Sequence, residues 1–180
     1  MWQRVLQIGS GGGNTPITEL FLYNKGDFCE DLTGGWTALE VLNKDAKNSG
    51  FIASKPIITP KSNSVNVKNG TNTTVPFGIY VMNKKISGQY IQQLGLNKLK
   101  MEINNVGSFV EHPTRTLFIS SSIASGFTPE LSANIISSGT VTEIDISSLD
   151  YLKGYYIGIS VSSWNANKFD IDVLKIYLEQ

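Results

Sequence analysis

The sequence predicts an all-β protein, an antiparallel β-sandwich with at most one or two short helices. The clearest observation is the alternation of apolar and polar residues over 155–178. In its first run, the apolar residues that share one strand face are Tyr155, Ile157, Ile159 and Val161. In its second run, Phe169, Ile171 and Val173 alternate with polar residues. Two such runs separated by a short polar loop predict a packed antiparallel sheet.

The second observation is a change of phase within the last run. After Val173 the apolar positions move by one residue, to Leu174, Ile176 and Leu178. A shift of one residue would turn every following side chain to the opposite face of a regular strand. The sequence therefore predicts either a β-bulge here or a crossing of the chain between two sheets.

The third observation is the composition. Charged residues make up 17% of the 180 residues, below the roughly 25% of ordinary soluble domains, and Ser, Thr, Asn and Gly take their place. Many turn-forming residues and few helical patterns favour a sandwich or barrel over alternating strands and helices. The length fits one domain.

The chain begins with a short apolar segment and a glycine cluster at residues 9–13. We interpret residues 1–14 as an N-terminal arm with a glycine-rich linker that would tie the arm to another subunit. The alternative is a loop whose backbone closely approaches a neighbouring segment. Residues 15–180 are expected to form the single β-sandwich domain.

Strand-like runs follow at short spacing, separated by turn sequences such as Asn-Lys-Gly-Asp at 24–27. We expect strands at Glu19–Tyr23, Phe51–Ser54, Ser64–Lys68, Thr73–Met82, Lys98–Asn104, Thr114–Ser120, Glu130–Ile136, Thr140–Ile146, Tyr155–Val161 and Lys168–Leu178. The fifth of these has a clear alternation, with Leu99, Met101 and Ile103 predicted to face the core.

Two segments have helical features. Thr37 and Glu40 have the spacing of a capping box, which predicts a short helix over 38–47, although Leu39 and Val41 fit a strand equally well. Residues 86–94 are expected to supply a single helical turn.

The sequence offers no set of residues for catalysis, so we expect a protein that is not an enzyme. His112 is the only histidine and Cys29 the only cysteine, which leaves no Ser-His-Asp arrangement in a recognisable motif and no zinc ligand set. Asp170 and Asp172 share a strand face; they would bind a cation or simply keep an outer face solvated, and we favour the second reading. The glycine cluster does not open a helix and so does not fit a phosphate loop. No cofactor and no metal is expected.

The charge balance and the hydropathy argue against nucleic acid and membranes as partners. Fifteen basic residues balance fifteen acidic ones, so there is no overall attraction for nucleic acid or an anionic membrane. No apolar run approaches the about 18 residues of a membrane span, and residues 1–8 are too short and polar for a signal peptide.

Two tryptophans in polar surroundings are the features that suggest binding. Trp36 follows two glycines, and Trp164 lies among serines and asparagines. An indole face beside amide and hydroxyl groups suits a sugar ring. We therefore predict that glycan contacts are made by Trp36, Trp164, Asn165 and Asn167. The alternative is that each tryptophan caps the end of the sandwich core.

Two stretches resemble known proteins. Residues 20–36, with the pattern Tyr-Asn-x-Gly-Asp-x-Cys and then Thr-Gly-Gly-Trp, and residues 142–157 are similar to small β-rich proteins encoded among tail and appendage genes of phages and prophages of Gram-positive bacteria (Firmicutes). The early Gly-Gly-Trp and the closing strand also resemble the galactose-binding-like jelly rolls found in many carbohydrate-binding modules.

The resemblance implies a non-enzymatic virion structural protein of a bacteriophage or prophage, located in the tail or an appendage. Such a protein would be made in the bacterial host cytoplasm without a signal peptide and would then be incorporated into the virion. Its expected partners are other virion proteins, further copies of itself in a homo-oligomer, and host-surface carbohydrate as a target of host recognition. The alternative hypothesis is a carbohydrate-binding module that recognises cell-surface polysaccharide through the loop tryptophans.

Overall fold

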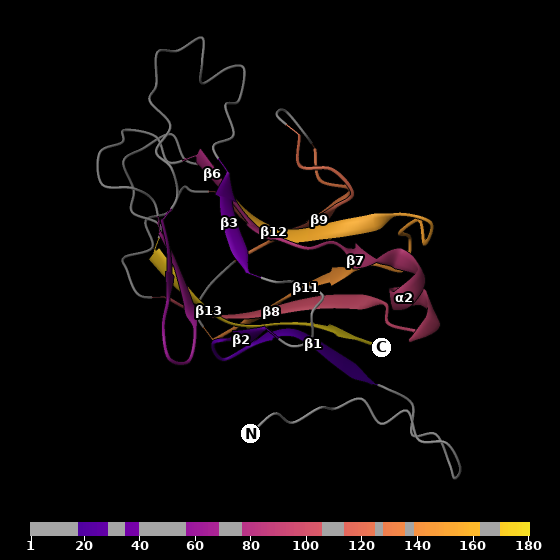
Figure 1. The fold of residues 1–180 in the computed structure, drawn as a ribbon, viewed down its shortest axis with the longest axis horizontal. Coiled ribbons are helices and arrows are strands. Elements are labelled where there is room, and N and C mark those ends of the chain that lie inside the picture. The colour runs from indigo at the N-terminus through magenta and orange to yellow at the C-terminus, as the bar shows by residue number, and fades with distance from the viewer. Residues whose placement is uncertain are drawn as a thin grey trace.

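The computed structural model describes residues 18–28, 35–39, 57–68, 77–105, 114–124, 128–135, 139–162 and 170–180. In these ranges the strands form two antiparallel sheets that pack face to face, and the short helix α2 (Gly88–Gln93) lies at one end between the two layers (Figure 1). The predicted class, an all-β antiparallel sandwich, is confirmed. The second predicted helical segment, 86–94, contains α2.

One sheet has seven strands among the described residues. Its main path is β11 (Val141–Asp145), β8 (Lys98–Asn105), β13 (Asp170–Glu179), β1 (Glu19–Asn24) and β2 (Asp27–Phe28), and β5 (Val65–Lys68) and β4 (Ile57–Pro60) extend it. Strand β13 pairs with β8 on one side, and on the other side first with β5 and then with β1. Its register shifts between Val173 and Lys175. The change of phase in the sequence is therefore a β-bulge, at the point where β13 changes neighbours.

The opposite sheet has six strands in the described ranges. Its path is β10 (Leu131–Asn134), β9 (Thr114–Ser120), β12 (Gly154–Ser162), β6 (Phe77–Met82) and β3 (Trp36–Leu39), with β7 (Ile86–Ser87) paired to the start of β12. The two runs that predict the fold most clearly, now β12 and β13, thus lie in opposite sheets and are not paired. A period of two residues shows that a strand has one buried face, but it does not select the neighbouring strand.

The core lies between the sheets. The inward residues of β8, Leu99, Met101 and Ile103, are at most 2% exposed, which confirms their predicted orientation. They meet inward residues from the opposite sheet, which include Leu117, Ile119, Tyr155, Ile157 and Ile159. Each fully buried side chain of this kind contributes roughly 1.5–3 kcal/mol, and the sandwich depends on these contacts.

Several predicted elements are changed or fall outside the described residues. Residues 38 and 39 belong to β3 and not to the start of a helix, and residues 40–47 lie outside the described ranges. The expected strand at 51–54 and the arm and linker at 1–14 also lie outside them. Strands β2 and β4 were not predicted, because two residues are too few for a pattern and Pro60 is unfavourable in a strand.

The turn between β1 and β2 requires two residues with positive φ. Asn24 pairs with Asp27, and between them Lys25 has φ 47° and Gly26 has φ 100°. Positive φ at both central positions matches a two-residue type I′ hairpin turn. A Cβ on Gly26 would lie 2.9 Å from the carbonyl oxygen of Ser62, so this glycine is required for space as well. Lysine is unfavourable at the other position.

Lys25→Asn is expected to stabilise the protein. Asparagine tolerates the left-handed conformation better than lysine, and the gain is about 0.5–1 kcal/mol, or a few degrees in Tm for a chain of this size. Thermal unfolding measures it. Lys98→Asn, in extended strand β8, is the matched control and is expected to give no stabilisation. An unchanged or lower Tm for Lys25→Asn would contradict the turn assignment.

Candidate functional site

The outward face of the seven-stranded sheet carries many charges, and several of them are paired within the protein. Lys175 lies 2.9 Å from a carboxylate oxygen of Glu102, and Lys100 forms ion pairs with Glu143 and Glu179. The hydrogen bond from Lys100 holds the pKa of Glu179 below its ordinary value. These cross-strand pairs describe a solvated face and do not point to a ligand.

Asp170 and Asp172 lie on this face as predicted, and donors of the protein itself hold them. Asn66 Nδ2 donates to Asp170 Oδ1 at 2.7 Å and to Asp172 Oδ1 at 2.8 Å, and Lys61 Nζ donates to Asp172 at 2.8 Å. This arrangement favours the solvated-face reading of the aspartate pair.

The described part of the chain contains no group of three or more His, Cys, Asp or Glu side chains that would hold a metal ion. His112 and Cys29 lie outside the described residues. Within the same ranges, no helix combines the length and the apolar character that crossing a membrane requires.

Of the four residues predicted to contact glycan, Trp36 is the one within the described ranges. It pairs with Met82 across β3 and β6, is partly buried, and lies 5.9 Å from the ring of Tyr23 and 6.2 Å from the ring of Phe28. Its Nε1 is buried without an acceptor among the described residues. These are the surroundings of a side chain at the edge of the core, as in the alternative reading. Trp164, Asn165 and Asn167 lie outside the described residues, and their role stays a prediction.

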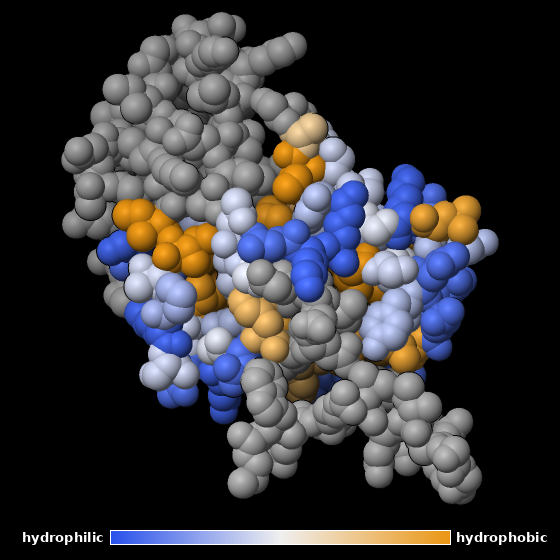
Figure 2. Space-filling view, viewed as in Figure 1, coloured by the Kyte–Doolittle hydropathy of each residue, from blue (hydrophilic) through white to orange (hydrophobic). Residues whose placement is uncertain are grey.

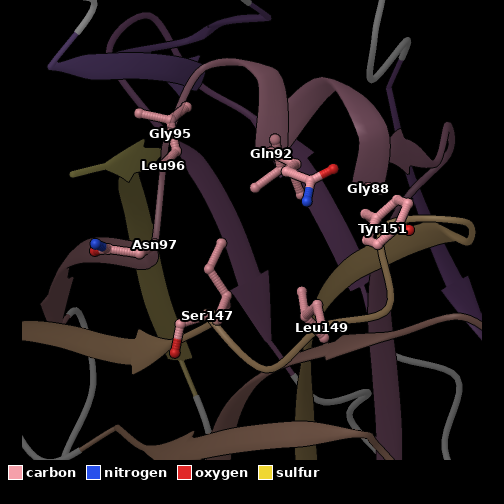
Figure 3. A pocket seen from close by; sticks show the side chains of 10 residues that line it. Gly88, Gln92, Gly95, Leu96, Asn97, Ser147, Leu149 and Tyr151 are labelled. Atoms are coloured by element: carbon pink, nitrogen blue, oxygen red, sulfur yellow. The ribbon is translucent and has the colours of Figure 1, made fainter.

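A cavity of about 320 Å³ lies where α2, the start of β8 and the loop after β11 meet (Figure 3). We call it the helix pocket. Its inner wall is apolar, with Ile91, Leu96 and Ile146 each at most 5% exposed. Around its rim Figure 3 shows the polar side chains Gln92, Asn97, Ser147 and Tyr151. Among the described residues, its lining includes no acidic or basic side chain.

The loop over residues 146–153, which we call the tip loop, is fixed by backbone hydrogen bonds. Leu149 N–H donates to the Ile146 carbonyl at 3.1 Å, and Lys153 N–H donates to the Asp150 carbonyl at 3.1 Å. Asp150 Oδ1 also accepts from Leu152 N–H at 3.0 Å. The loop is therefore two successive turns.

The tip loop is also attached to its neighbours. Gly88 N–H donates to the Lys153 carbonyl at 2.8 Å, and the hydroxyl of Tyr155 donates to the Asp150 carbonyl at 2.8 Å. A Cβ on Gly88 would lie 2.9 Å from Tyr151 Cα and from the Lys153 oxygen, so glycine allows this close contact. The backbone that carries Tyr151 is thus held in place.

Two large apolar side chains are exposed on this loop. Tyr151 is 47% exposed and Leu152 72%. In Figure 2 small groups of hydrophobic residues interrupt the hydrophilic surface, and some of them lie at the end of the sandwich where Figure 1 places α2. Exposed apolar groups on a fixed turn beside a cavity are typical of a binding site.

A second cavity, of about 280 Å³, lies on the other side of the tip loop, and we call it the side pocket. Its lining includes Glu130, Ser148, Asp150, Lys153 and Tyr155. Leu149 lines both pockets. Unlike the helix pocket, the side pocket carries charges. Lys153 Nζ is 3.9 Å from Asp150 Oδ2, which makes a loose ion pair.

Glu130 at the side pocket is held as a carboxylate. Desolvation raises its pKa, but hydrogen bonds from the Ser121 hydroxyl, the Ser121 N–H and Ser120 outweigh this effect, and the pKa lies below its ordinary value of 4.5. A pKa lowered by folding contributes stability above the ordinary pKa, and that stability is lost as the pH falls through the folded pKa.

Glu130→Gln is therefore expected to be less stable than the wild type near neutral pH, with a difference that shrinks as the pH falls below the ordinary pKa of 4.5. Urea unfolding of both proteins at pH values from about 6 to about 3 measures it. A difference that stays constant or grows in acid would contradict this role of Glu130.

The sequence analysis did not identify the helix pocket. Its residues come from two segments, 88–97 in α2 and after it and 146–151 in the tip loop, which only the folded topology brings together. A weak signal was present in Asp150-Tyr151-Leu152-Lys153-Gly154, where two apolar residues occupy the centre of a turn sequence.

Comparison with protein-family models and with curated proteins finds no match. Among solved structures, the chain is similar to a family 11 carbohydrate-binding module from Clostridium thermocellum in complex with a β-1,3-1,4-mixed-linked tetrasaccharide, with a TM-score of 0.49, 20% identity, and coverage of 91% of this chain and 96% of that chain. A carbohydrate-binding module of the β-sandwich superfamily, studied for promiscuous specificity, gives a TM-score of 0.48 and 10% identity, over 81% of this chain and 58% of that chain. The K2 cleaved adhesin domain of Lys-gingipain gives a TM-score of 0.47 and 13% identity, over 90% of this chain and 99% of that chain.

Proposed function

We propose that this chain is a non-catalytic carbohydrate-binding domain and that the helix pocket is its binding site. The observation that carries the proposal is the exposed ring of Tyr151 on a fixed turn, at the rim of a pocket with amide and hydroxyl groups and no charge. A sugar offers an apolar C–H face for an aromatic ring and hydroxyl groups for neutral polar side chains. The two sets of groups are complementary.

The residues that line the helix pocket favour some classes of ligand over others. A phosphate or nucleotide site would present cations or a set of backbone N–H groups at a helix N-terminus, and the described residues that line the helix pocket include no Lys or Arg. A purely apolar ligand would make no use of the polar side chains of Gln92 and Asn97 at the rim. A neutral ligand with many hydroxyl groups satisfies both the apolar wall and the polar rim.

The fixed tip loop supports the same function. Because hydrogen bonds from Gly88 and Tyr155 hold the loop, Tyr151 is close to one position before a ligand arrives. Binding then costs little ordering of the protein. A weak ligand such as a sugar benefits most from a site prepared in this way.

Binding without catalysis follows from the same residues. Hydrolysis of a glycosidic bond needs two carboxyl groups on either side of the bond. The described lining of the helix pocket has none, and the two carboxylates of the neighbouring side pocket, Glu130 and Asp150, accept hydrogen bonds from Ser121 and from Leu152 N–H. A non-catalytic role therefore fits the helix pocket better than hydrolysis.

The role as a virion protein stays a prediction that rests on the sequence resemblance. It is compatible with the proposed function, because a carbohydrate-binding domain on a phage appendage would meet polysaccharides of the host surface. The comparisons with known proteins do not address it.

A glycan array probed with the full chain tests the proposed function, followed by calorimetric titration with the oligosaccharide that binds best. The array should include bacterial wall polysaccharides and neutral glucans. We expect binding, and we expect Trp164→Ala to retain it. Failure to bind any glycan would contradict the proposal. Loss of binding in Trp164→Ala together with full binding in Tyr151→Ala would instead favour the site predicted from the sequence.

A further inference from the structure

We propose that the carbohydrate site extends over both pockets, so that the protein binds the interior of a polysaccharide chain and not a single terminal sugar. This inference rests on the proposed function. The ligand chain would run from the helix pocket across the tip loop into the side pocket.

The tip loop separates the pockets and supplies side chains to both. Ser147 and Tyr151 line the helix pocket, whereas Ser148, Asp150 and Lys153 line the side pocket. Leu149, between them in sequence, lines both. The two cavities are therefore neighbours on either side of one narrow loop, and a linear ligand in one of them has a direct path to the other.

The size of each pocket favours a ligand that uses both. The cavities measure about 320 Å³ and 280 Å³, just above and just below the lower limit of the roughly 300–1,000 Å³ typical of small-molecule sites. Each suits a ligand of one or two rings. Two adjacent cavities of this kind suit successive units of a chain.

The chemistry of the side pocket identifies the group that would bind the second part of the chain. Both oxygens of Glu130 accept hydrogen bonds from Ser121, and Asp150 Oδ1 accepts from Leu152 N–H. Lys153 has the loosest ion pair among the described residues, at 3.9 Å, and its side chain is 51% exposed. Its ammonium is thus available to donate to hydroxyl, carbonyl or carboxylate oxygens of a sugar unit.

An oligosaccharide series tests the inference. The full chain is titrated with one to four units of the sugar identified on the array. We expect affinity to rise by about tenfold or more from one unit to four units, because the longer ligand gains contacts in the side pocket. Equal affinity for one unit and four units would overturn the extended site while leaving the proposed function intact. Absence of binding to every length would overturn both.

Two variants locate the second part of the site. Ser148→Phe fills the side pocket and Lys153→Met removes its donor but keeps the length of the side chain. We expect each to weaken binding of the four-unit ligand by about fivefold or more and to change binding of one unit by less than about twofold. Val141→Phe, at the far and exposed end of β11, is the control for added bulk. Unchanged binding of the four-unit ligand by both variants, with their Tm close to that of the wild type, would refute the proposed path.

Discussion

Replacement of Gly158 by alanine is expected to destabilise the protein by about 3 kcal/mol, the largest effect of a single added methyl group at any described glycine. Gly158 lies in β12 opposite Val81 of β6. A Cβ at this position would overlap the carbonyl oxygen of Tyr80 and would lie 2.7 Å from Phe118 Cζ. The first of these atoms belongs to the backbone of the neighbouring strand, so the strand pair itself must move.

Gly154→Ala, in the same strand, is the matched control. A Cβ there would meet only the flexible side chain of Lys85, at 3.3 and 3.4 Å, and the Ile86 carbonyl at 3.7 Å. We expect a change within about 1 kcal/mol for this variant. Urea unfolding of both variants measures the free energy of unfolding. Similar stabilities of the two variants would contradict the close packing of β12 against β6.

The second large effect is expected in binding. Tyr151→Ala should weaken binding of the identified glycan by about tenfold or more, because it removes the exposed ring at the rim of the helix pocket and with it about 1–2 kcal/mol of apolar contact. Tyr151→Phe keeps the ring and should lose less than about threefold. Calorimetric titration gives both values.

Leu152→Ala is the matched control for this experiment. Leu152 is the next residue in the same turn and is more exposed than Tyr151, but it lines neither pocket. It should bind the glycan as the wild type does. Wild-type affinity in Tyr151→Ala, or an equal loss in Leu152→Ala, would show that the ring does not contact the ligand.

The strands with a clean alternation of residues could be predicted from the sequence, because a half-buried strand imposes a period of two. Leu99, Met101 and Ile103 of β8 face the core as predicted. The change of phase at Val173 marks a real bulge. These features depend on local sequence alone.

What could not be predicted depends on contacts between distant segments. Thr37 has the local signature of a helix cap, yet it lies in β3 and its hydroxyl donates to Asn83 of the segment after β6. Pairing with β6 therefore overrides the local preference. The assignment of β12 and β13 to opposite sheets is likewise a property of the whole topology.

The candidate site also depends on contacts between distant segments, which the local sequence does not predict. The size and polar neighbours of the tryptophans predict glycan contacts, which stay a prediction, and in the fold Trp36 packs against Tyr23 and Phe28 at the edge of the core. Tyr151 has only the weak signal of an apolar residue inside a turn sequence, and folding brings it beside α2. Exposure distinguishes the two rings, and exposure is a property of the fold.

The most direct test of the account is a map of the bound glycan on the protein by amide chemical-shift changes in the isotope-labelled full chain. Binding at the helix pocket predicts that the largest changes fall on residues 88–97 and 146–153. Changes confined to the outward face of either sheet, or to segments remote from α2 and the tip loop, would contradict the account.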